Sequence, residues 1–217
     1  MTLLRLICVC LVLLFGAEAV SGETRVAAVG TSLTQRGDWP EILARTLASC
    51  VDGDVAVQRF AAAGRGSGWG VSQLDRVISA KPAIVLVEFA INDADVLDGV
   101  SLSVSRKNHE EIVDRLRAAN RGVAVFLVTT NPVDGPRGWV RPFLAEYYQL
   151  YRDIARAKAV GLIDLHAVWR AALAAGDRDR LIPDGLHPAE AAFVRVALPV
   201  IREHLSRFLG APSAGCF

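Results

Sequence analysis

A serine near the start of the chain and a histidine near its end carry the reactive side chains of a hydrolase. Ser32 directly follows an apolar segment, and Asp184 stands three residues before His187. A serine hydroxyl becomes a nucleophile when a neutral imidazole takes its proton, and a carboxylate holds that imidazole in the required tautomer. These residues therefore predict a Ser–His–Asp triad in which Ser32 attacks, His187 transfers the proton and Asp184 orients the ring.

Each of these segments also has an ordinary structural interpretation. Serine is common in turns and at helix caps, and Pro-Asp-Gly at 183–185 is a typical turn sequence. Pro188 favours the first turn of a helix, so His187 is expected at the N-terminus of the last helix. The helix dipole disfavours an imidazolium there, whereas Asp184 favours it, and this balance would keep the base close to neutrality.

Two further residues could donate hydrogen bonds to an oxyanion. Acyl transfer needs N–H groups aimed at the developing negative oxygen, each contributing about 3–4 kcal/mol. The backbone N–H of Gly64, in a glycine-rich stretch, and the side-chain amide of Asn92 suit this task. Taken singly, glycine and asparagine are also ordinary loop residues.

The elements that must position these residues alternate along the chain. Apolar segments typical of strands are separated by helical patterns, which predicts one parallel sheet covered by helices on both faces. Ser32, Gly64 and Asn92 follow the first three strands, in loops, so we expect all three at one edge of the sheet. The strands are expected at 24–29, 55–60, 83–89, 123–128 and 161–165.

Capping and proline residues mark the expected helix limits. Asp38 and Glu41 form a candidate capping box, with Pro40 in the first turn of a helix that ends near Ser49. Pro199 would kink or split the last helix. The other helices are expected from the glycine-rich stretch to residue 79, and over 105–120, 142–158, 166–175 and 188–208.

Four spaced blocks of this sequence resemble the SGNH hydrolase superfamily, the GDSL-type esterases and lipases. The resemblance implies a three-layer α/β/α, flavodoxin-like sandwich with a five-stranded parallel sheet over residues 24–209. It also implies carboxylic ester hydrolysis through an acyl-enzyme without a cofactor, the oxyanion being held by the N–H groups of Ser32 and Gly64 and by the Asn92 amide. The blocks are Gly30-Thr31-Ser32-Leu33-Thr34, Ala63-Gly64-Arg65-Gly66-Ser67, Ala90-Ile91-Asn92-Asp93 and Asp184-Gly185-Leu186-His187.

Two positions depart from the pattern of that family. The family usually has Asp where Thr31 stands and Gly where Ala90 stands. Neither position belongs to the triad, so the departures bear on rate and subfamily more than on fold. Arg65 and Trp69, next to the site, are candidate substrate contacts, with a solvated arginine and a core tryptophan as the common alternatives.

The first nineteen residues have the pattern of a signal peptide. Arg5 is followed by an apolar run and by Ala17-Glu18-Ala19, a small-residue cleavage site. About ten to twelve helical residues span about 15–18 Å, less than the 30 Å or so of bilayer hydrocarbon, so cleavage is expected rather than a retained anchor. We therefore expect a secreted or periplasmic protein with no stable membrane span, and a loose tail at residues 210–217.

Two cysteines, Cys50 and Cys216, remain after removal of residues 1–19. An exported chain could pair them, which would link the C-terminal tail to the end of the first long helix. Separate thiols are the alternative, and a thiol count on the unreduced protein distinguishes the two.

Composition limits the other classes of function. The 217 residues are 52% hydrophobic and 22% charged with a net charge of +1, which predicts one globular domain and gives no basic patch for nucleic acid. No His/Cys cluster has metal-ligand spacing, and the glycines at 64, 66, 68 and 70 do not match the dinucleotide-binding fingerprint.

The expected partner is a small-molecule, lipid or glycan ester. Acyl transfer through the same acyl-enzyme and non-catalytic glycan binding on the same fold stay open.

Overall fold

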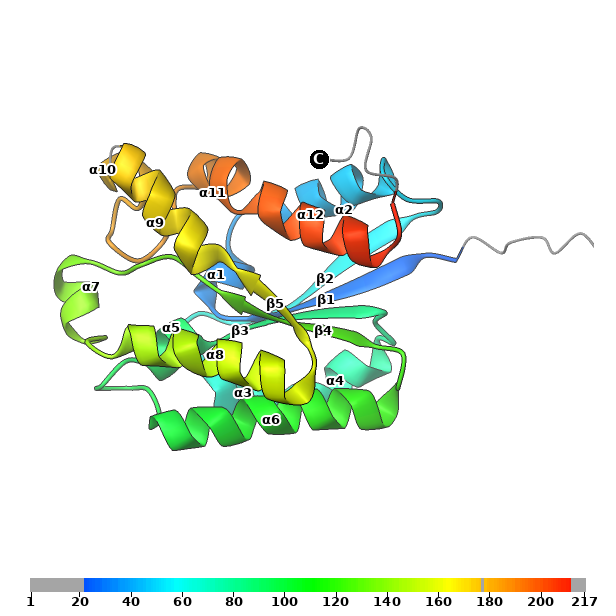
Figure 1. Ribbon diagram of the computed structural model, residues 1–217, viewed down its shortest axis with the longest axis horizontal. Coiled ribbons are helices and arrows are strands. Elements are labelled where there is room, and N and C mark those ends of the chain that lie inside the picture. The colour runs from blue at the N-terminus through cyan, green and yellow to red at the C-terminus, as the bar shows by residue number, and fades with distance from the viewer. Residues whose placement is uncertain (1–21, 177, 212–217) are drawn as a thin grey trace, which may run out of the picture.

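The sheet is entirely parallel, and its strand order places the first strand in the interior. The computed structural model describes residues 22–176 and 178–211. Its five strands lie in the order β2-β1-β3-β4-β5 (Figure 1), which confirms the predicted flavodoxin-like arrangement. The strands are β1 (Thr24–Gly30), β2 (Val55–Ala61), β3 (Ile84–Glu88), β4 (Ala124–Thr129) and β5 (Gly161–Asp164).

Helices cover both faces of this sheet and form the outer layers of the sandwich (Figure 1). One face is covered by α2 (Trp39–Ala48), α9 (Leu165–Ala175), α11 (Glu190–Val196) and α12 (Leu198–Phe208). The other is covered by α3 (Ser67–Ser72), α4 (Leu74–Ser79), α6 (Leu102–Ala119) and α8 (Leu144–Lys158). The short helices are α1 (Ser32–Gln35), α5 (Ala90–Asp93), α7 (Gly135–Trp139) and α10 (Arg178–Leu181).

Alternation along the central strands explains the two cores. Successive strand side chains point to opposite faces, so a strand buried on both faces is apolar throughout. In β1, Ala27 and Val29 pack on the side of α6 and α8, whereas Val26 and Ala28 pack on the side of α2 and α12. The sheet therefore holds the end of β1 rigidly between two packed layers.

Several helix limits differ from the sequence expectations. The side chain of Asp38 makes no capping hydrogen bond, because its backbone (φ −99°, ψ 16°) is not extended, and Glu41 pairs with Arg59 instead. The candidate capping box is therefore wrong. Pro199 lies in the first turn of α12 and splits the last helix into two. Asn92, expected in a loop, lies in α5, a helix of only four residues.

Some expectations fall outside the described residues. The predicted signal peptide at 1–19 and Cys216 are among them, so the pair with Cys50 stays a prediction. Cys50 itself is buried just after α2. In residues 22–176 and 178–211, no helix has the length and apolar character needed to cross a bilayer.

Candidate active site

The predicted site residues meet at the carboxyl ends of the strands. β1 is flanked by β2 and β3, so the connections leave it in opposite directions, and this is the switch point at which α/β sheets bind ligands. Ser32 follows β1, Gly64 follows β2 and Asn92 follows β3, and all three line one cavity together with His187. The expectation that these residues share one edge of the sheet is confirmed.

Ser32 is the first residue of α1 and is held there by its neighbours. The Thr31 side chain caps the helix, since its Oγ1 accepts a hydrogen bond from the Leu33 N–H at 3.2 Å. Gly30 leaves no room for a side chain, because a Cβ there would clash with the Glu88 carboxyl group. The strand exit is therefore both tight and capped, and it presents the Ser32 hydroxyl at the end of the sheet.

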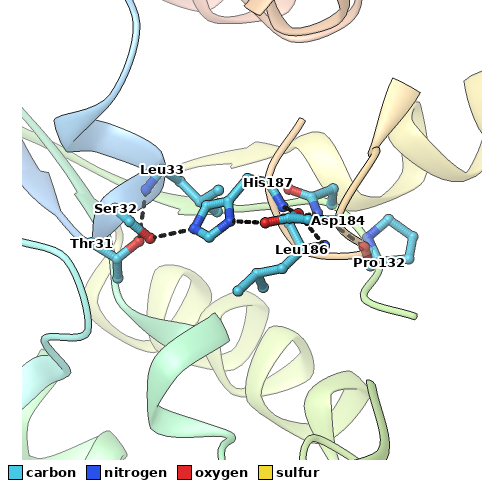
Figure 2. A network of polar contacts seen from close by, with 8 residues as sticks. Thr31, Ser32, Leu33, Pro132, Asp184, Leu186 and His187 are labelled. Carbon is cyan, nitrogen blue, oxygen red and sulfur yellow. Dashed lines mark hydrogen bonds and ion pairs between the residues drawn. The ribbon is translucent and has the colours of Figure 1, made fainter. Parts of the chain in front are cut away.

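His187 lies between Ser32 and Asp184 in one line of hydrogen bonds (Figure 2). The Ser32 Oγ is 2.9 Å from His187 Nε2, and His187 Nδ1 is 2.6 Å from Asp184 Oδ2. A carboxylate only accepts hydrogen bonds, so an ionised Asp184 places the imidazole proton on Nδ1. The Nε2 lone pair then faces the serine hydroxyl, and this arrangement can remove its proton.

The ionised form of Asp184 is stabilised by its own turn. Partial burial acts to raise the pKa of Asp184, but hydrogen bonds from the His187 ring, the His187 N–H and the Leu186 N–H outweigh it and lower the pKa to about 2. The two backbone N–H groups both donate to Oδ1, at 2.6 and 3.0 Å. Oδ2 is thus left for the ring.

The loop after β4 supports the turn that carries Asp184 and His187. The Asn131 side chain donates to the Leu186 carbonyl at 2.9 Å, and the Asp134 N–H donates to the Gly185 carbonyl at 2.8 Å. Gly185 has φ +73°, and a Cβ there would lie 2.8 Å from the Asp134 carbonyl oxygen. His187 precedes α11, which starts at Glu190, so the expectation that it begins the last helix is wrong.

The two predicted oxyanion donors come from the loop after β2 and from helix α5, and these two segments contact each other. The Asn92 Nδ2 donates to the Arg65 carbonyl at 2.9 Å, one residue after Gly64. A primary amide carries two N–H donors, so one hydrogen bond to Arg65 leaves a second N–H for a ligand. The cavity next to these groups also holds Asp95, Arg137 and the buried Arg141, and it measures about 290 Å³.

A second cavity opens on the other side of the serine and histidine. It measures about 240 Å³ and is lined by the apolar side chains of Leu33, Trp39 and Phe193, with Arg36 and Glu190 as its charged residues. Ser32, Arg36 and His187 line both cavities. The Ser32 hydroxyl therefore lies between a mainly apolar cavity and a mainly polar one.

Arg65 and Trp69, the predicted substrate contacts, line neither cavity. Arg65 is exposed, and its contribution is the carbonyl that accepts from Asn92. Trp69 packs edge-on against Phe89, with ring centroids 6.3 Å apart. Arg36, Arg137 and Arg141 are the arginines that line the two cavities, and none of them stands in a motif that would have identified it.

Glu88 is a buried carboxyl group at the end of β3, in contact with Thr31, and no sequence motif assigned it a role. It accepts hydrogen bonds from the Thr31 N–H at 2.6 Å and from the Thr34 hydroxyl at 2.7 Å. Burial raises the pKa of Glu88 to about 7, against the opposing effect of these hydrogen bonds. The signal for it was the single charge in the apolar run 83–89.

Arg141 ties the helix that carries Asn92 to the loop after β4. Its Nε donates to the Ile91 carbonyl at 2.7 Å, and its Nη2 pairs with Asp95 Oδ2 at 2.9 Å. Both charges are largely buried, which suits a structural ion pair rather than a free ligand. Among the described residues, no group of three or more His, Cys, Asp or Glu side chains could hold a metal ion.

The sequence matches one known protein family over most of its length. The model of the GDSL-like lipase/acylhydrolase family matches residues 26–193. No curated protein matches the sequence significantly. The chain belongs to the GDSL-like lipase/acylhydrolase family, and it is a hydrolase that acts on ester bonds.

Solved structures support the same fold assignment. A lipase/acylhydrolase from Enterococcus faecalis has a TM-score of 0.74 and 21% identity, covering 88% of this chain and 100% of the other. An acetylxylan esterase from Geobacillus stearothermophilus has a TM-score of 0.71 and 16% identity, covering 88% and 97%. A GDSL-like lipase from Bacteroides thetaiotaomicron has a TM-score of 0.65 and 16% identity, covering 85% and 89%. The predicted SGNH hydrolase fold is thereby confirmed.

Proposed function

We propose that this protein is a serine esterase that works through an acyl-enzyme formed on Ser32. The observation that carries the proposal is the continuous line from Ser32 Oγ through the His187 ring to Asp184, with distances of 2.9 and 2.6 Å. Hydrogen bonding between nucleophile, base and orienting carboxylate is the arrangement that activates a serine hydroxyl. In the proposed reaction, Ser32 is the nucleophile, His187 the general base and acid, and Asp184 the orienting group.

The proposed reaction has two halves. Ser32 Oγ attacks the ester carbonyl carbon while His187 Nε2 takes its proton, and the carbonyl oxygen becomes an oxyanion that accepts from the Ser32 and Gly64 N–H groups and the Asn92 amide. The carbonyl re-forms, the C–O bond to the alcohol breaks, and His187 returns the proton to the leaving alkoxide. Water then attacks the acyl group by the same route, releasing the acid and regenerating Ser32. The oxyanion donors stabilise charge that exists only in the transition state and intermediate.

We further propose that the two cavities receive the two halves of a small ester. The acyl group would enter the apolar space beside Leu33 and Phe193, since transfer of apolar surface from water favours it there. A polar alcohol would occupy the other cavity, which is lined by Arg137 and by the exposed Asp98. Acyl transfer to a hydroxyl acceptor would use the same acyl-enzyme.

Turnover of p-nitrophenyl esters of increasing acyl length tests this proposal. We expect hydrolysis of short and medium acyl groups, with kcat/KM falling once the chain exceeds the cavity of about 240 Å³. Transfer of the acyl group to an added alcohol, in preference to water, would assign the protein to acyl transfer. A folded protein that turns over no ester in either assay would contradict the proposal and favour the binding alternative.

We also propose that the protein is exported and loses residues 1–19. The basic, apolar and small-residue regions in that order support export. An exported protein whose intact mass corresponds to a start near Val20 is the expected result. A mass that includes the first residues would favour a retained anchor.

A further inference from the structure

A chain of buried polar side chains binds the loop that carries Gly64 and the helix that carries Asn92. It runs from Asp93 through Ser105 and His109 to Tyr151, and each of these residues is at most 1% exposed. Ser105 and His109 belong to α6, and Tyr151 belongs to α8. Burying so many polar groups is costly unless all are hydrogen-bonded, and the hydrogen bonds show what the cluster holds in place.

At one end, the Tyr151 hydroxyl binds the start of the helix that carries Asn92. It accepts hydrogen bonds from the N–H groups of Phe89 at 2.8 Å and Ala90 at 3.1 Å. A phenol with both acceptor positions used has one proton left to donate, and His109 Nε2 lies 2.8 Å away. Tyr151 therefore caps α5 only while His109 Nε2 is an acceptor.

The tautomer of His109 follows from its two neighbours. Because Nε2 accepts from Tyr151, the ring proton is on Nδ1, which lies 2.8 Å from the Ser105 carbonyl oxygen. Burial lowers the pKa of His109, against the opposing effects of the Asp93 charge and the Ser105 backbone hydrogen bond. The ring is thus a neutral link with one donor and one acceptor.

At the other end, Asp93 joins the loop of Gly64 to the helix of Asn92. Its Oδ2 accepts from the Ser105 hydroxyl at 2.6 Å, and its Oδ1 accepts from the Ser67 N–H at 2.8 Å. The Asp93 carboxylate lies close to the backbone of Gly66, since a Cβ there would be 2.6 Å from Asp93 Oδ1. Asp93 directly follows Asn92, so this carboxylate links the two segments that carry the predicted donors.

We propose that Ser105, His109 and Tyr151 are positioning residues of the oxyanion site, which hold the Gly64 loop and the Asn92 helix in one relative placement. The proposal rests on the proposed function, in which Gly64 and Asn92 stabilise the oxyanion. None of the three side chains lines either cavity at Ser32, so they act through the backbone that they bind. Preorganised donors lose their effect when displaced, so loosening this cluster should slow the chemical step and leave substrate binding unchanged.

A double-mutant cycle between Tyr151→Phe and Asn92→Ala tests this positioning role. Asn92→Ala alone should lower kcat about 10²–10³-fold, as expected for loss of one oxyanion donor. Tyr151→Phe alone should lower kcat by about tenfold with KM unchanged, because it removes the acceptor for two N–H groups at the start of α5. In the Asn92→Ala background, the same change should cost less than about twofold, since the group that it positions is absent.

Tyr147→Phe is the matched control for this cycle. It makes the same substitution in the same helix and removes a hydroxyl that donates to the Val100 carbonyl, outside the cluster. Its kcat should match that of the wild type. If Tyr151→Phe does not fold, Ser105→Ala replaces it, because it deletes only the hydroxyl that binds Asp93, and the same non-additivity is expected.

The outcomes separate this inference from the proposed function. A wild-type protein without esterase activity would contradict both. An active wild type in which Tyr151→Phe keeps full kcat, or loses the same factor with and without Asn92, would overturn the positioning role alone. If Tyr151→Phe instead raised KM and left kcat unchanged, the positioning role would also be overturned, because a displaced oxyanion donor acts on the transition state.

Discussion

Replacing Ser32 by alanine is expected to lower kcat for ester hydrolysis by at least about 10⁴-fold while leaving the fold intact. The substitution removes the only atom that can form the acyl-enzyme in the proposed reaction. The fold should tolerate it, because the α1 cap is provided by Thr31 and the Ser32 hydroxyl contacts only His187 among the hydrogen bonds described. Steady-state hydrolysis of a p-nitrophenyl ester, beside a thermal unfolding curve, measures both effects.

Ser72→Ala provides the matched control for that experiment. Ser72 is an exposed serine at the end of α3, and its hydroxyl donates to the Trp69 carbonyl, away from both cavities. Activity should be unchanged in this variant. A Ser32→Ala protein that keeps more than about one hundredth of the wild-type rate would assign the nucleophile to another group. Loss of the thermal transition would point instead to a structural role for Ser32.

The placement of Ser32, Gly64 and Asn92 was predictable because parallel strands impose it. Each residue follows a strand whose apolar character is visible in the sequence, and the carboxyl ends of parallel strands lie at one edge. Placing the three residues at that edge needed no information beyond the succession of parallel strands. The local turn at Asp184 was predictable for a similar reason, since Asp and His three residues apart across a glycine can meet.

The supporting groups were not predictable because their partners are distant in the sequence. Glu88 meets Thr31 only because β3 pairs with β1, and His109 meets Tyr151 only because α6 packs beside α8. Asp184 stands three residues from His187 in the chain, whereas His109 reaches Asp93 through Ser105, a serine on its own helix. Burial of such groups becomes visible only when the sheet is assembled.

The short elements were missed for a different physical reason. A four-residue helix such as α5 contains a single turn, so its apolar residues show no helical period. Its stability comes from tertiary groups, which include the Tyr151 hydroxyl at its start and Arg141 at its second residue. Likewise, Pro188 suggested a helix start that the structure places two residues later. Tertiary hydrogen bonds decide such boundaries.

Asp184→Asn is expected to lower kcat by about 10⁴-fold, with folding largely preserved. The reason lies in how the two carboxylate oxygens are used. Oδ1 accepts from the N–H groups of Leu186 and His187, so the amide oxygen of an asparagine must take that place. The amide NH₂ then faces His187 Nδ1 and donates to it. The ring proton moves to Nε2, where it points at Ser32 Oγ. Nε2 then has no free lone pair and cannot accept the serine proton.

Asp98→Asn separates this tautomer effect from the loss of a negative charge. Asp98 is exposed and lines the polar cavity, but no hydrogen bond described here links it to His187. With a p-nitrophenyl ester, this control should keep kcat within about twofold, because exposed charges are screened by solvent. A lost contact between Asp98 and a polar alcohol would appear in KM for esters of such alcohols instead. If Asp184→Asn and Asp98→Asn lowered kcat equally, charge alone would matter. A large loss confined to Asp184→Asn means that a single proton, held on Nδ1 by the Asp184 turn, controls whether Ser32 can react.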